Sequence, residues 1–339
     1  MRYKLLGPSG LRVAEVALGT MTFGDTIPWG APRDECRRIF DAYVEAGGNF
    51  IDTAINYTGG MSEQLVGEFI AGQRDCFVVA TKYTMHPPTG DPNVAGNHRK
   101  NLVRALESSL RRLGTDYIDL YWVHAWDGIT PVEEMMRALD DQVRAGKILY
   151  LGISNAPAWV VAQANTLAAL RGWTPFTGLQ ISYSLIERSA ERDLLPMARA
   201  FGLGVTAWAP LGSGLLTGKY NRVDPAEARR LDTSTAVTVD DQKLAVAAAV
   251  WEVAQELDRS PAQVALAWVR QRGAIPLLGA RTLAQFAENL ACLGLTLDAD
   301  QLARLEAASA IDLGYPHDFL ARDNIRTSVT AGMQQLLDI

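Results

Sequence analysis

Four side chains with acid–base chemistry stand where short apolar runs of the chain end. They are the carboxylate Asp52, the ammonium Lys82 and the imidazole His124, with the phenol Tyr57 five positions after Asp52. An unperturbed phenol has a pKa of about 10, and an ammonium beside it favours the ionised form. A Tyr next to a Lys can therefore give a proton to a substrate oxygen closer to neutral pH. In such an arrangement Asp52 would hold the ammonium and His124 would orient a carbonyl oxygen.

Each of the four also has an ordinary structural explanation. Asp52 suits a turn or a helix cap, and Tyr57 suits a loop. Lys82 suits a strand end with its ammonium in solvent, and His124 suits a hydrogen-bonded position in a core. Residues so far apart in sequence act together only if the fold brings several strand ends to one place.

Eight short runs rich in β-branched and other apolar residues predict buried strands. They cover residues 16–18, 50–52, 77–82, 117–124, 148–154, 179–182, 205–209 and 274–278. Segments of helix length separate these runs. Glycines that mark helix ends are Gly47, Gly48, Gly72, Gly114, Gly146 and Gly273.

Three helix starts carry a capping signal. Thr130 and Ser260 each precede a Pro at the first helical position and stand three residues before a Glu or a Gln. This is the capping-box arrangement, which predicts a helix that begins at the Pro. Thr282 has the same spacing to a Gln without the Pro.

Strands that alternate with helices imply a parallel sheet, either open and doubly wound or closed into a barrel. Eight strands, with no Pro-, Gly- or Ser-rich linker between two lobes, favour an α/β fold of the TIM (β/α)8 type. We expect one domain over residues 1–339, with the barrel at about 13–293 and a C-terminal helix and tail at 298–339.

Three further segments lie outside the repeat. Residues 3–6 and 11–13 predict a small hairpin that could plug the lower mouth of the barrel. The polar connection 211–240 and the tail 311–339, which carries Tyr315, His317 and Phe319, are candidates for covering a site. Connections of that length in a compact domain are usually lids or disordered segments.

Composition excludes several classes of protein. Of 339 residues, 48% are hydrophobic and 21% charged, enough for a folded core. A net charge of −6 without a polybasic run argues against a nucleic-acid partner. Cys36, Cys76 and Cys292 stand apart, which predicts neither a disulfide framework nor a zinc site. No signal core or membrane span is evident, so we expect a cytoplasmic chain without a membrane partner.

An ordered set of motifs resembles the aldo-keto reductase family. The matching segments are residues 18–24 (LGTMTFG), 52–57 (DTAINY), 80–82 (ATK), 116–124 (DYIDLYWVH), 152–155 (GISN) and 279–281 (GAR), followed by Glu288 and Asn289. The resemblance runs from about residue 3 to residue 309. It implies a barrel oxidoreductase that reduces aldehydes or ketones with NADPH and without a Rossmann domain.

The family's catalytic tetrad falls on Asp52, Tyr57, Lys82 and His124 without substitution. The resemblance implies that hydride passes from the nicotinamide to the carbonyl carbon while Tyr57 protonates the forming alkoxide. Lys82, held by Asp52, would tune Tyr57, and His124 would position the oxygen. Proton transfer of this kind contributes roughly 10²–10⁴-fold to a rate.

The resemblance also implies a set of cofactor contacts, but these residues match the family less completely than the tetrad does. On the nicotinamide side they are Gly19, Thr20, Met21, Asp52, Ser154, Asn155, Gln180 and Trp208, which stands where many members stack an aromatic ring. On the phosphate and adenosine side they are Leu211, Gly212, Ser213, Gly214, Leu215, Lys219, Gly279, Arg281, Gln285, Glu288 and Asn289. Some reductases have Lys or Arg where Gln285 stands, so NADH stays open beside NADPH. Taken alone, Trp208 is more simply a core aromatic residue and 211–219 a flexible loop.

Four aromatic side chains, Phe23, Trp29, Tyr83 and Trp126, fall in loops that would border the nicotinamide and favour an apolar or aromatic pocket. An equally good explanation for each of these residues, taken alone, is that it simply covers the barrel rim. No Arg cluster indicates a phosphorylated sugar, so aryl and aliphatic aldehydes are the first expectation for the small-molecule carbonyl substrate. The sequence does not indicate an oligomeric state.

Three rival functions can be compared with this one. Potassium channel β subunits resemble the same family and act as cofactor-binding regulators, but the predicted barrel begins almost at once and the tetrad is complete. A metal-dependent hydrolase would need ligands, and His86, His98, His124 and His317 show no ligand spacing, so no metal is expected. In short-chain dehydrogenases the Tyr and Lys are four apart on a helix, whereas here they are 82 − 57 = 25 apart.

Overall fold

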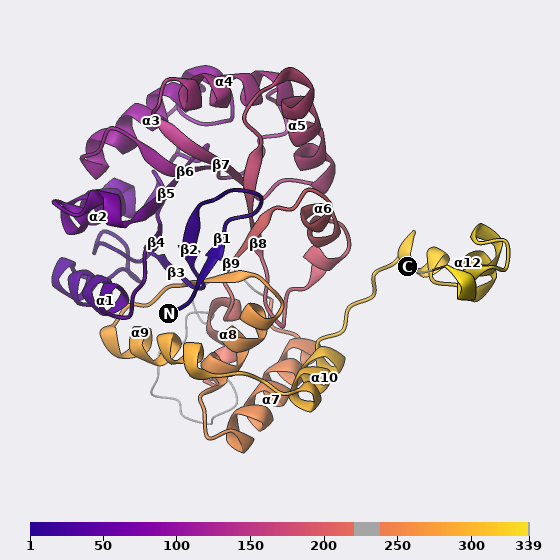
Figure 1. Ribbon diagram of the computed structural model, residues 1–339. Helices are drawn as coiled ribbons and strands as arrows, with labels where there is room; N and C mark the ends of the chain where they lie inside the picture. The colour runs from indigo at the N-terminus through magenta and orange to yellow at the C-terminus, as the bar shows by residue number, and fades with distance from the viewer. Residues whose placement is uncertain (220–237, 338–339) are drawn as a thin grey trace.

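The computed structural model describes residues 1–219 and 238–337, and its centre is a closed barrel of eight parallel strands (Figure 1). The strands pair in the order β10-β3-β4-β5-β6-β7-β8-β9. Their bounds are β3 Ala17–Gly19, β4 Phe50–Asp52, β5 Val78–Tyr83, β6 Ile118–Val123, β7 Ile148–Ser154, β8 Phe176–Ser182, β9 Gly204–Trp208 and β10 Ile275–Leu278. Each overlaps one of the eight predicted runs, so the prediction of a TIM (β/α)8 barrel is confirmed.

Helices surround the barrel on the outside (Figure 1). Their bounds are α1 Arg33–Glu45, α2 Met61–Ile70, α3 Arg99–Leu113, α4 Val132–Arg144, α5 Ala158–Arg171, α6 Leu194–Ala200, α7 Asp241–Glu256, α8 Pro261–Gln271, α9 Leu283–Leu290 and α10 Ala299–Ala308. In the described part of the chain no helix is long and apolar enough to cross a membrane.

A small antiparallel hairpin, β1 Tyr3–Leu5 with β2 Arg12–Ala14, lies across one end of the barrel (Figure 1). Leu6 and Val13 pack into the barrel interior. Gly7 lies so close to the first residues of β8 and β9 that a Cβ there would stand 2.3 Å from the Thr177 carbonyl oxygen. The predicted hairpin is therefore present, and it closes the end of the barrel where the strands begin.

The helix signals are confirmed except at one start. Ser260 forms the full capping box at α8, and the Thr282 side chain accepts the Gln285 N–H at α9. Thr130 does not cap α4, which has Pro131 at its N-cap. Its backbone N–H and its hydroxyl both donate to the Asp127 carboxylate, at 2.8 and 2.7 Å, so Thr130 belongs to a turn that Asp127 closes before the helix.

Five of the six glycines predicted to end helices adopt the left-handed backbone that ends them, and Gly48 does not. Gly47, Gly72, Gly114, Gly146 and Gly273 have φ between 62° and 89°. Residues with a side chain enter this left-handed region only at a cost, so a helix stops there.

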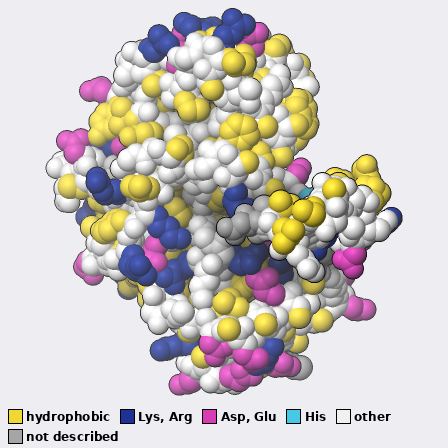
Figure 2. Space-filling model, turned by 45° about the vertical axis from the view of Figure 1, so that its right-hand side comes forward, with side chains coloured by type: hydrophobic (Ala, Val, Ile, Leu, Met, Phe, Trp, Pro, Cys, Tyr) yellow, Lys and Arg dark blue, Asp and Glu magenta, His cyan; other side chains and the backbone are white. Residues whose placement is uncertain are grey.

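The C-terminal tail does not cover the barrel mouth. It carries α11 His317–Leu320 and α12 Asp323–Val329, and Figures 1 and 2 show these helices projecting from the side of the molecule. Tyr315 is 86% exposed and Phe319 39%. Of the other segment predicted to cover a site, 211–240, residues 220–237 lie outside the described residues.

The barrel interior is built around the indole of Trp122, which is fully buried on β6. Two strand glycines make room for it. A Cβ on Gly152 of β7 would lie 2.2 Å from the ring, and one on Gly178 of β8 would lie 2.9 Å from it. The interior is thus so filled at positions 152 and 178 that neither can carry a side chain.

We predict that Gly152→Ala lowers the free energy of unfolding by about 2 kcal/mol or more, because overpacking displaces the indole or the strands. Urea denaturation followed by circular dichroism measures this. Gly19→Ala is the matched control on β3, where an added Cβ has its nearest neighbour at 3.6 Å and should change stability far less. Equal stability of the two variants would contradict the prediction.

Candidate active site

Alternation along three adjacent strands brings the predicted acid–base residues together. Phe50 of β4, Val78 and Ala80 of β5, and Leu120 and Trp122 of β6 form one cluster inside the barrel. Side chains two positions apart point to the same face of a strand. Continuing these inward rows by two positions reaches Asp52, Lys82 and His124, at the ends of the strands.

The ammonium of Lys82 is completely buried and uses its three donors. It forms an ion pair with the Asp52 carboxylate, donates to the Thr53 carbonyl oxygen at 2.9 Å, and donates to the Tyr57 hydroxyl oxygen at 3.1 Å. Since the Tyr57 oxygen accepts this bond, its own proton is left to be donated elsewhere.

The imidazole of His124 lies across from the phenol. The ring centroids of Tyr57 and His124 are 5.9 Å apart, with the planes at 81°. The Nδ1 atom of His124 is buried and has no hydrogen-bond partner. The phenol, the ammonium and the imidazole therefore share one place, as the sequence predicted.

Burial and charge set the protonation of the site. Burial raises the pKa of the Tyr57 phenol, and the charge of Lys82 opposes that rise without cancelling it. The pKa of Lys82 is also raised: burial lowers it, but Asp52 and Tyr57 favour the charged form more strongly. Burial, with the nearby Lys82 charge, lowers the pKa of His124 to about 3. The site thus combines a protonated phenol, a charged ammonium and a neutral imidazole at neutral pH.

Gln180 is bonded differently from the expectation for a cofactor residue. On β8 and 2% exposed, it donates its Nε2 to the second oxygen of Asp52 at 3.0 Å. Asp52 is therefore held from both sides, by Lys82 and by Gln180. The side-chain oxygen of Gln180 is not used in this bond.

The residues after β7 present polar atoms at the same mouth. The Oγ atom of Ser154 is buried and without a partner. Asn155 is exposed, has φ of 47°, and donates its side-chain N–H to the His124 carbonyl oxygen at 2.8 Å. An orphaned hydroxyl beside two carboxamides suits a ligand that itself carries a carboxamide.

Three predicted cofactor residues follow or end β3. Gly19 and Met21 are partly exposed, but Thr20 is completely buried. Its backbone N–H and its hydroxyl both donate to the Asp52 carbonyl oxygen, at 3.0 Å each. In this structure Thr20 supports the Asp52 backbone and presents no surface to a ligand.

Trp208 and the glycine-rich segment after β9 lie at the mouth as expected. Trp208 is 37% exposed, so it is not a core aromatic residue. Residues Gly212–Thr217 form the short helix η4, in which Ser213 and Gly214 have φ of 55° and 99°. Gly212 and Leu215 are buried, while Leu211, Ser213, Gly214 and Lys219 are partly exposed. Successive left-handed residues can turn N–H groups toward an anion. In this turn the Gly212 and Gly214 N–H groups already donate to the Ala209 and Leu211 carbonyl oxygens, at 2.9 and 3.0 Å, so other groups of the turn would have to bind the anion.

Around the start of α9, Gly279, Arg281 and Glu288 are exposed. The Gln285 side-chain oxygen accepts the Arg281 backbone N–H at 3.1 Å. Asn289 is mostly buried and lies 3.4 Å from the Gly279 carbonyl oxygen. Arg281 immediately precedes Thr282, the N-cap of α9, and a helix N-terminus favours anions.

Only two of the four aromatic residues predicted to border the pocket have exposed surface. Phe23 and Tyr83 are 1% and 0% exposed, and we assign both to the core. Tyr83 stacks on Tyr121 at 5.4 Å. Tyr83 was expected in a loop but is the last residue of β5, where its ring packs in the core. Trp29 and Trp126 are partly exposed.

Sequence reasoning missed Trp159, at the start of α5. It is 58% exposed and packs edge-on against Trp126, with ring centroids 5.2 Å apart. A hollow of about 390 Å³ begins nearby at Asn155 and is also lined by Ser182 and Arg192. The pairing of two Trp residues 33 positions apart has no local signal in the sequence.

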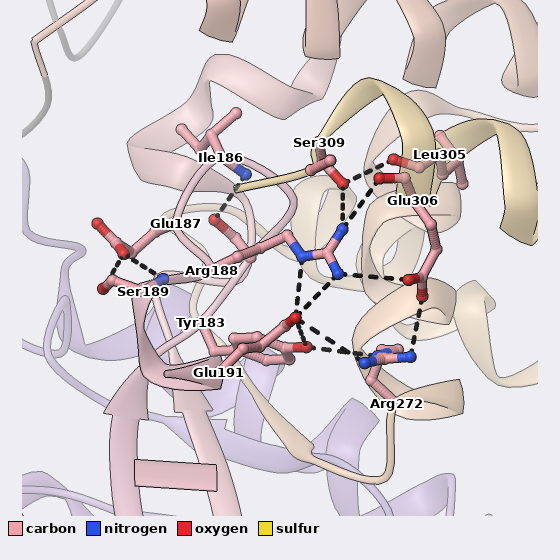
Figure 3. Close-up of polar contacts among 12 residues, drawn as sticks. Tyr183, Ile186, Glu187, Arg188, Ser189, Glu191, Arg272, Leu305, Glu306 and Ser309 are labelled. Atoms are coloured by element: carbon pink, nitrogen blue, oxygen red, sulfur yellow. Dashed lines mark hydrogen bonds and ion pairs between the residues drawn. The ribbon is translucent and has the colours of Figure 1, made fainter. Parts of the chain in front are cut away.

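Arg188, also missed, ties the segment after β8 to the C-terminal helix (Figure 3). Its guanidinium pairs with Glu191 at 2.9 Å and Glu306 at 3.3 Å, and donates to the Ser309 hydroxyl at 2.8 Å. Arg272 pairs with Glu306 from the other side at 3.0 Å. This network holds α10 of the outer layer against the segment that follows Gln180 and Ser182.

Within the described residues, no group of three or more His, Cys, Asp or Glu side chains could hold a metal ion.

We predict that His124 makes the stability of the protein fall in acid. The pKa of His124 is about 3 in the folded state, against an ordinary value of 6.5. The unfolded chain therefore binds the extra proton, so this contribution is complete above about pH 6.5 and is lost as the pH falls toward 3. Between pH 7 and 4.5, wild type should lose on the order of 2 kcal/mol more than His124→Gln.

Urea denaturation at the two pH values measures this difference. His86→Gln, at an exposed position, is the control and should retain the wild-type loss. An equal acid response in His124→Gln and wild type would mean that the imidazole is not kept neutral by the fold.

Comparison with known proteins agrees with the geometry. Residues 15–310 match the model of the aldo/keto reductase family. The chain is 36% identical to norsolorinic acid reductase A of Aspergillus parasiticus, over 97% of this chain and 87% of that one. It is 38% identical to an aryl-alcohol dehydrogenase of Pestalotiopsis microspora, over 94% and 85%, and 34% identical to a putative aryl-alcohol dehydrogenase of Saccharomyces cerevisiae, over 93% and 88%. The chain is an oxidoreductase and belongs to the aldo/keto reductase family.

Proposed function

We propose that this protein reduces aldehydes and ketones to alcohols with NADPH, and that Tyr57 is the proton donor. The observation that carries the proposal is the bond from the Lys82 ammonium to the Tyr57 oxygen at 3.1 Å, with Asp52 paired to the same ammonium. The hydroxyl proton of Tyr57 is free of that bond, and the imidazole of His124 lies beside it.

Each residue has one part in the proton transfer. Tyr57 gives its proton to the carbonyl oxygen, and the Lys82 charge stabilises the phenolate that remains. Asp52 keeps the ammonium in place. His124, neutral because burial lowers its pKa to about 3, can donate a hydrogen bond to the same oxygen without competing as an acid.

The residues at the mouth fit a nicotinamide cofactor. When bound, this cofactor supplies the hydride for the carbonyl carbon. The orphaned Ser154 hydroxyl, Asn155 and the unused oxygen of Gln180 would bind its carboxamide, and the exposed face of Trp208 would cover the ring. The turn at Ser213 and Gly214 and the Arg281 guanidinium would hold its phosphates.

For the substrate we propose an aryl carbonyl compound. The Trp126 and Trp159 rings pack edge to face at the mouth, and Trp159 is 58% exposed, which offers a flat apolar surface beside Asn155. The names of the relatives, norsolorinic acid reductase and aryl-alcohol dehydrogenase, support the same class. Aliphatic aldehydes are the second class to test.

We predict that Tyr57→Phe loses roughly 10²–10⁴-fold in turnover, because the proton donor is gone while the binding residues stay. Loss of NADPH absorbance with a panel of aryl and aliphatic aldehydes measures turnover, and quenching of Trp fluorescence measures NADPH binding, which should be nearly unchanged. Tyr117→Phe removes a phenol that bonds Asp75 at 2.8 Å and is the control.

Near wild-type turnover by Tyr57→Phe would refute the assignment. A wild-type protein that binds NADPH tightly but turns over no carbonyl compound of the panel would favour the cofactor-binding regulator instead.

We predict that Arg281→Ala weakens NADPH binding by about tenfold or more and NADH binding much less. A charged hydrogen bond to phosphate is worth about 1.5–3 kcal/mol, and only NADPH carries the additional 2′-phosphate. Dissociation constants for both cofactors test this, with the exposed Arg171→Ala on α5 as control. Equal weakening of NADPH and NADH binding would mean that Arg281 contacts a part that both cofactors share, and not the 2′-phosphate.

A further inference from the structure

The loop that carries Tyr57 has an unusual backbone. Thr58, Gly59 and Gly60 follow Tyr57 directly and have φ of 46°, 68° and 94°. Three successive left-handed residues are unfavourable for a chain with a side chain at Thr58, so contacts around the loop must hold this shape. Tyr57 belongs to this loop, whereas Asp52 and Lys82 belong to barrel strands.

One guanidinium occupies the inner side of this loop. Arg112, in the last turn of α3, donates its Nη1 to the Ile55 carbonyl oxygen at 3.0 Å. It also lies against Gly60, where a Cβ would stand 2.4 Å from its Cζ. Arg112 thus contacts the chain two residues before Tyr57 and three residues after it.

A buried carboxylate connects this guanidinium to the strand of Lys82. Glu63, in the first turn of α2, is 0% exposed and accepts from Arg112 at 3.1 Å. Its other oxygen accepts from the hydroxyl of Thr81 at 2.7 Å. Thr81 immediately precedes Lys82, and the Ile55 backbone N–H donates to the Lys82 carbonyl oxygen at 3.1 Å. Glu63 and Arg112 therefore add a side-chain link between the Tyr57 loop and β5 to this backbone bond.

We propose that Glu63 and Arg112 are positioning residues that set the place of the Tyr57 hydroxyl relative to the Lys82 ammonium. This inference rests on the proposed role of Tyr57 as proton donor. Neither residue bonds to a member of the tetrad side chain to side chain; both act through the backbone at Ile55 and Gly60 and through Thr81.

If Glu63 and Arg112 only stabilised the fold, their replacement would lower stability and leave the pKa of Tyr57 unchanged. A buried ion pair often adds little net stability, so stability alone does not explain its presence here. Displacement of a catalytic group by about 1 Å can cost about 10²-fold in rate. A small rotation of the loop would weaken the bond from Lys82 to the phenol while the barrel stays folded.

Displacement of the Tyr57 hydroxyl would change its pKa in a direction that follows from the groups around it. The ionisable groups that act on or contact Tyr57 are Lys82 from β5, Asp52 from β4 and His124 after β6. Lys82 lowers the pKa of the phenol, whereas burial and Asp52 raise it. If the hydroxyl moves away from the ammonium but stays buried, the loss of the Lys82 contribution raises the pKa of Tyr57.

The test compares Glu63→Gln, Arg112→Lys and Arg112→Met with wild type. We expect Glu63→Gln and Arg112→Met to lose about tenfold or more in kcat, with the NADPH dissociation constant unchanged, and the basic limb of the pH profile to move to higher pH. Arg112→Lys keeps the charge but has a single nitrogen, so it should recover part of kcat. The control is Glu15→Gln, which breaks a similarly buried ion pair with Arg270, 2.5 Å long and joined to the N-terminal hairpin.

A second measurement reads the phenol without any reaction. Titration of ¹³Cζ-tyrosine by NMR, with the Tyr57 signal assigned by its absence from Tyr57→Phe, should show a higher pKa in Glu63→Gln and Arg112→Met and no change in Glu15→Gln. Wild-type kcat and an unshifted Tyr57 titration in the Arg112 variants would overturn the positioning role. High turnover by Tyr57→Phe would instead refute the proposed function, while the NMR titration still decides whether the pair controls the phenol.

Discussion

The completely buried ammonium of Lys82 is the constraint on which the site depends. An uncompensated charge in a protein interior costs several kcal/mol, so each of its three donors needs an acceptor. Asp52, the Thr53 carbonyl oxygen and Tyr57 supply them. Once Lys82 occupies the barrel interior, one place for the phenol oxygen is favoured, because moving it would leave a buried donor unpaired.

Side-chain alternation explains why the strand residues of the site could be predicted from the sequence. Asp52, Lys82 and His124 each end an apolar run, and parallel strands end on the same face of a barrel. The helix starts at Ser260 and Thr282 could also be predicted, because a cap is a contact between residues three apart in the sequence. Features set by neighbours in sequence, or by the period of a strand, are therefore predictable from the residues alone.

Features set by contacts between distant segments were not predictable. Phe23 and Tyr83 have the residue types of a pocket lining, yet the core buries them. Gln180 bonds Asp52, 128 residues away in the chain, a contact that no local pattern indicates. In each case a partner brought near by the fold determines what an ordinary side chain does.

The strand residues of the site and the loop residue Tyr57 differ in how easily substitutions can move them. Register within a closed sheet places Asp52 beside Ala80 and Lys82 beside Trp122, and a strand cannot shift without breaking hydrogen bonds on both sides. Tyr57 lies in a loop whose shape depends on side chains from the outer helices. Substitutions in α2 or α3 can therefore move the phenol while Asp52, Lys82 and His124 stay in place. We therefore expect the position and the pKa of the Tyr57 hydroxyl to vary mainly with substitutions in the outer helices and little with substitutions elsewhere in the barrel strands.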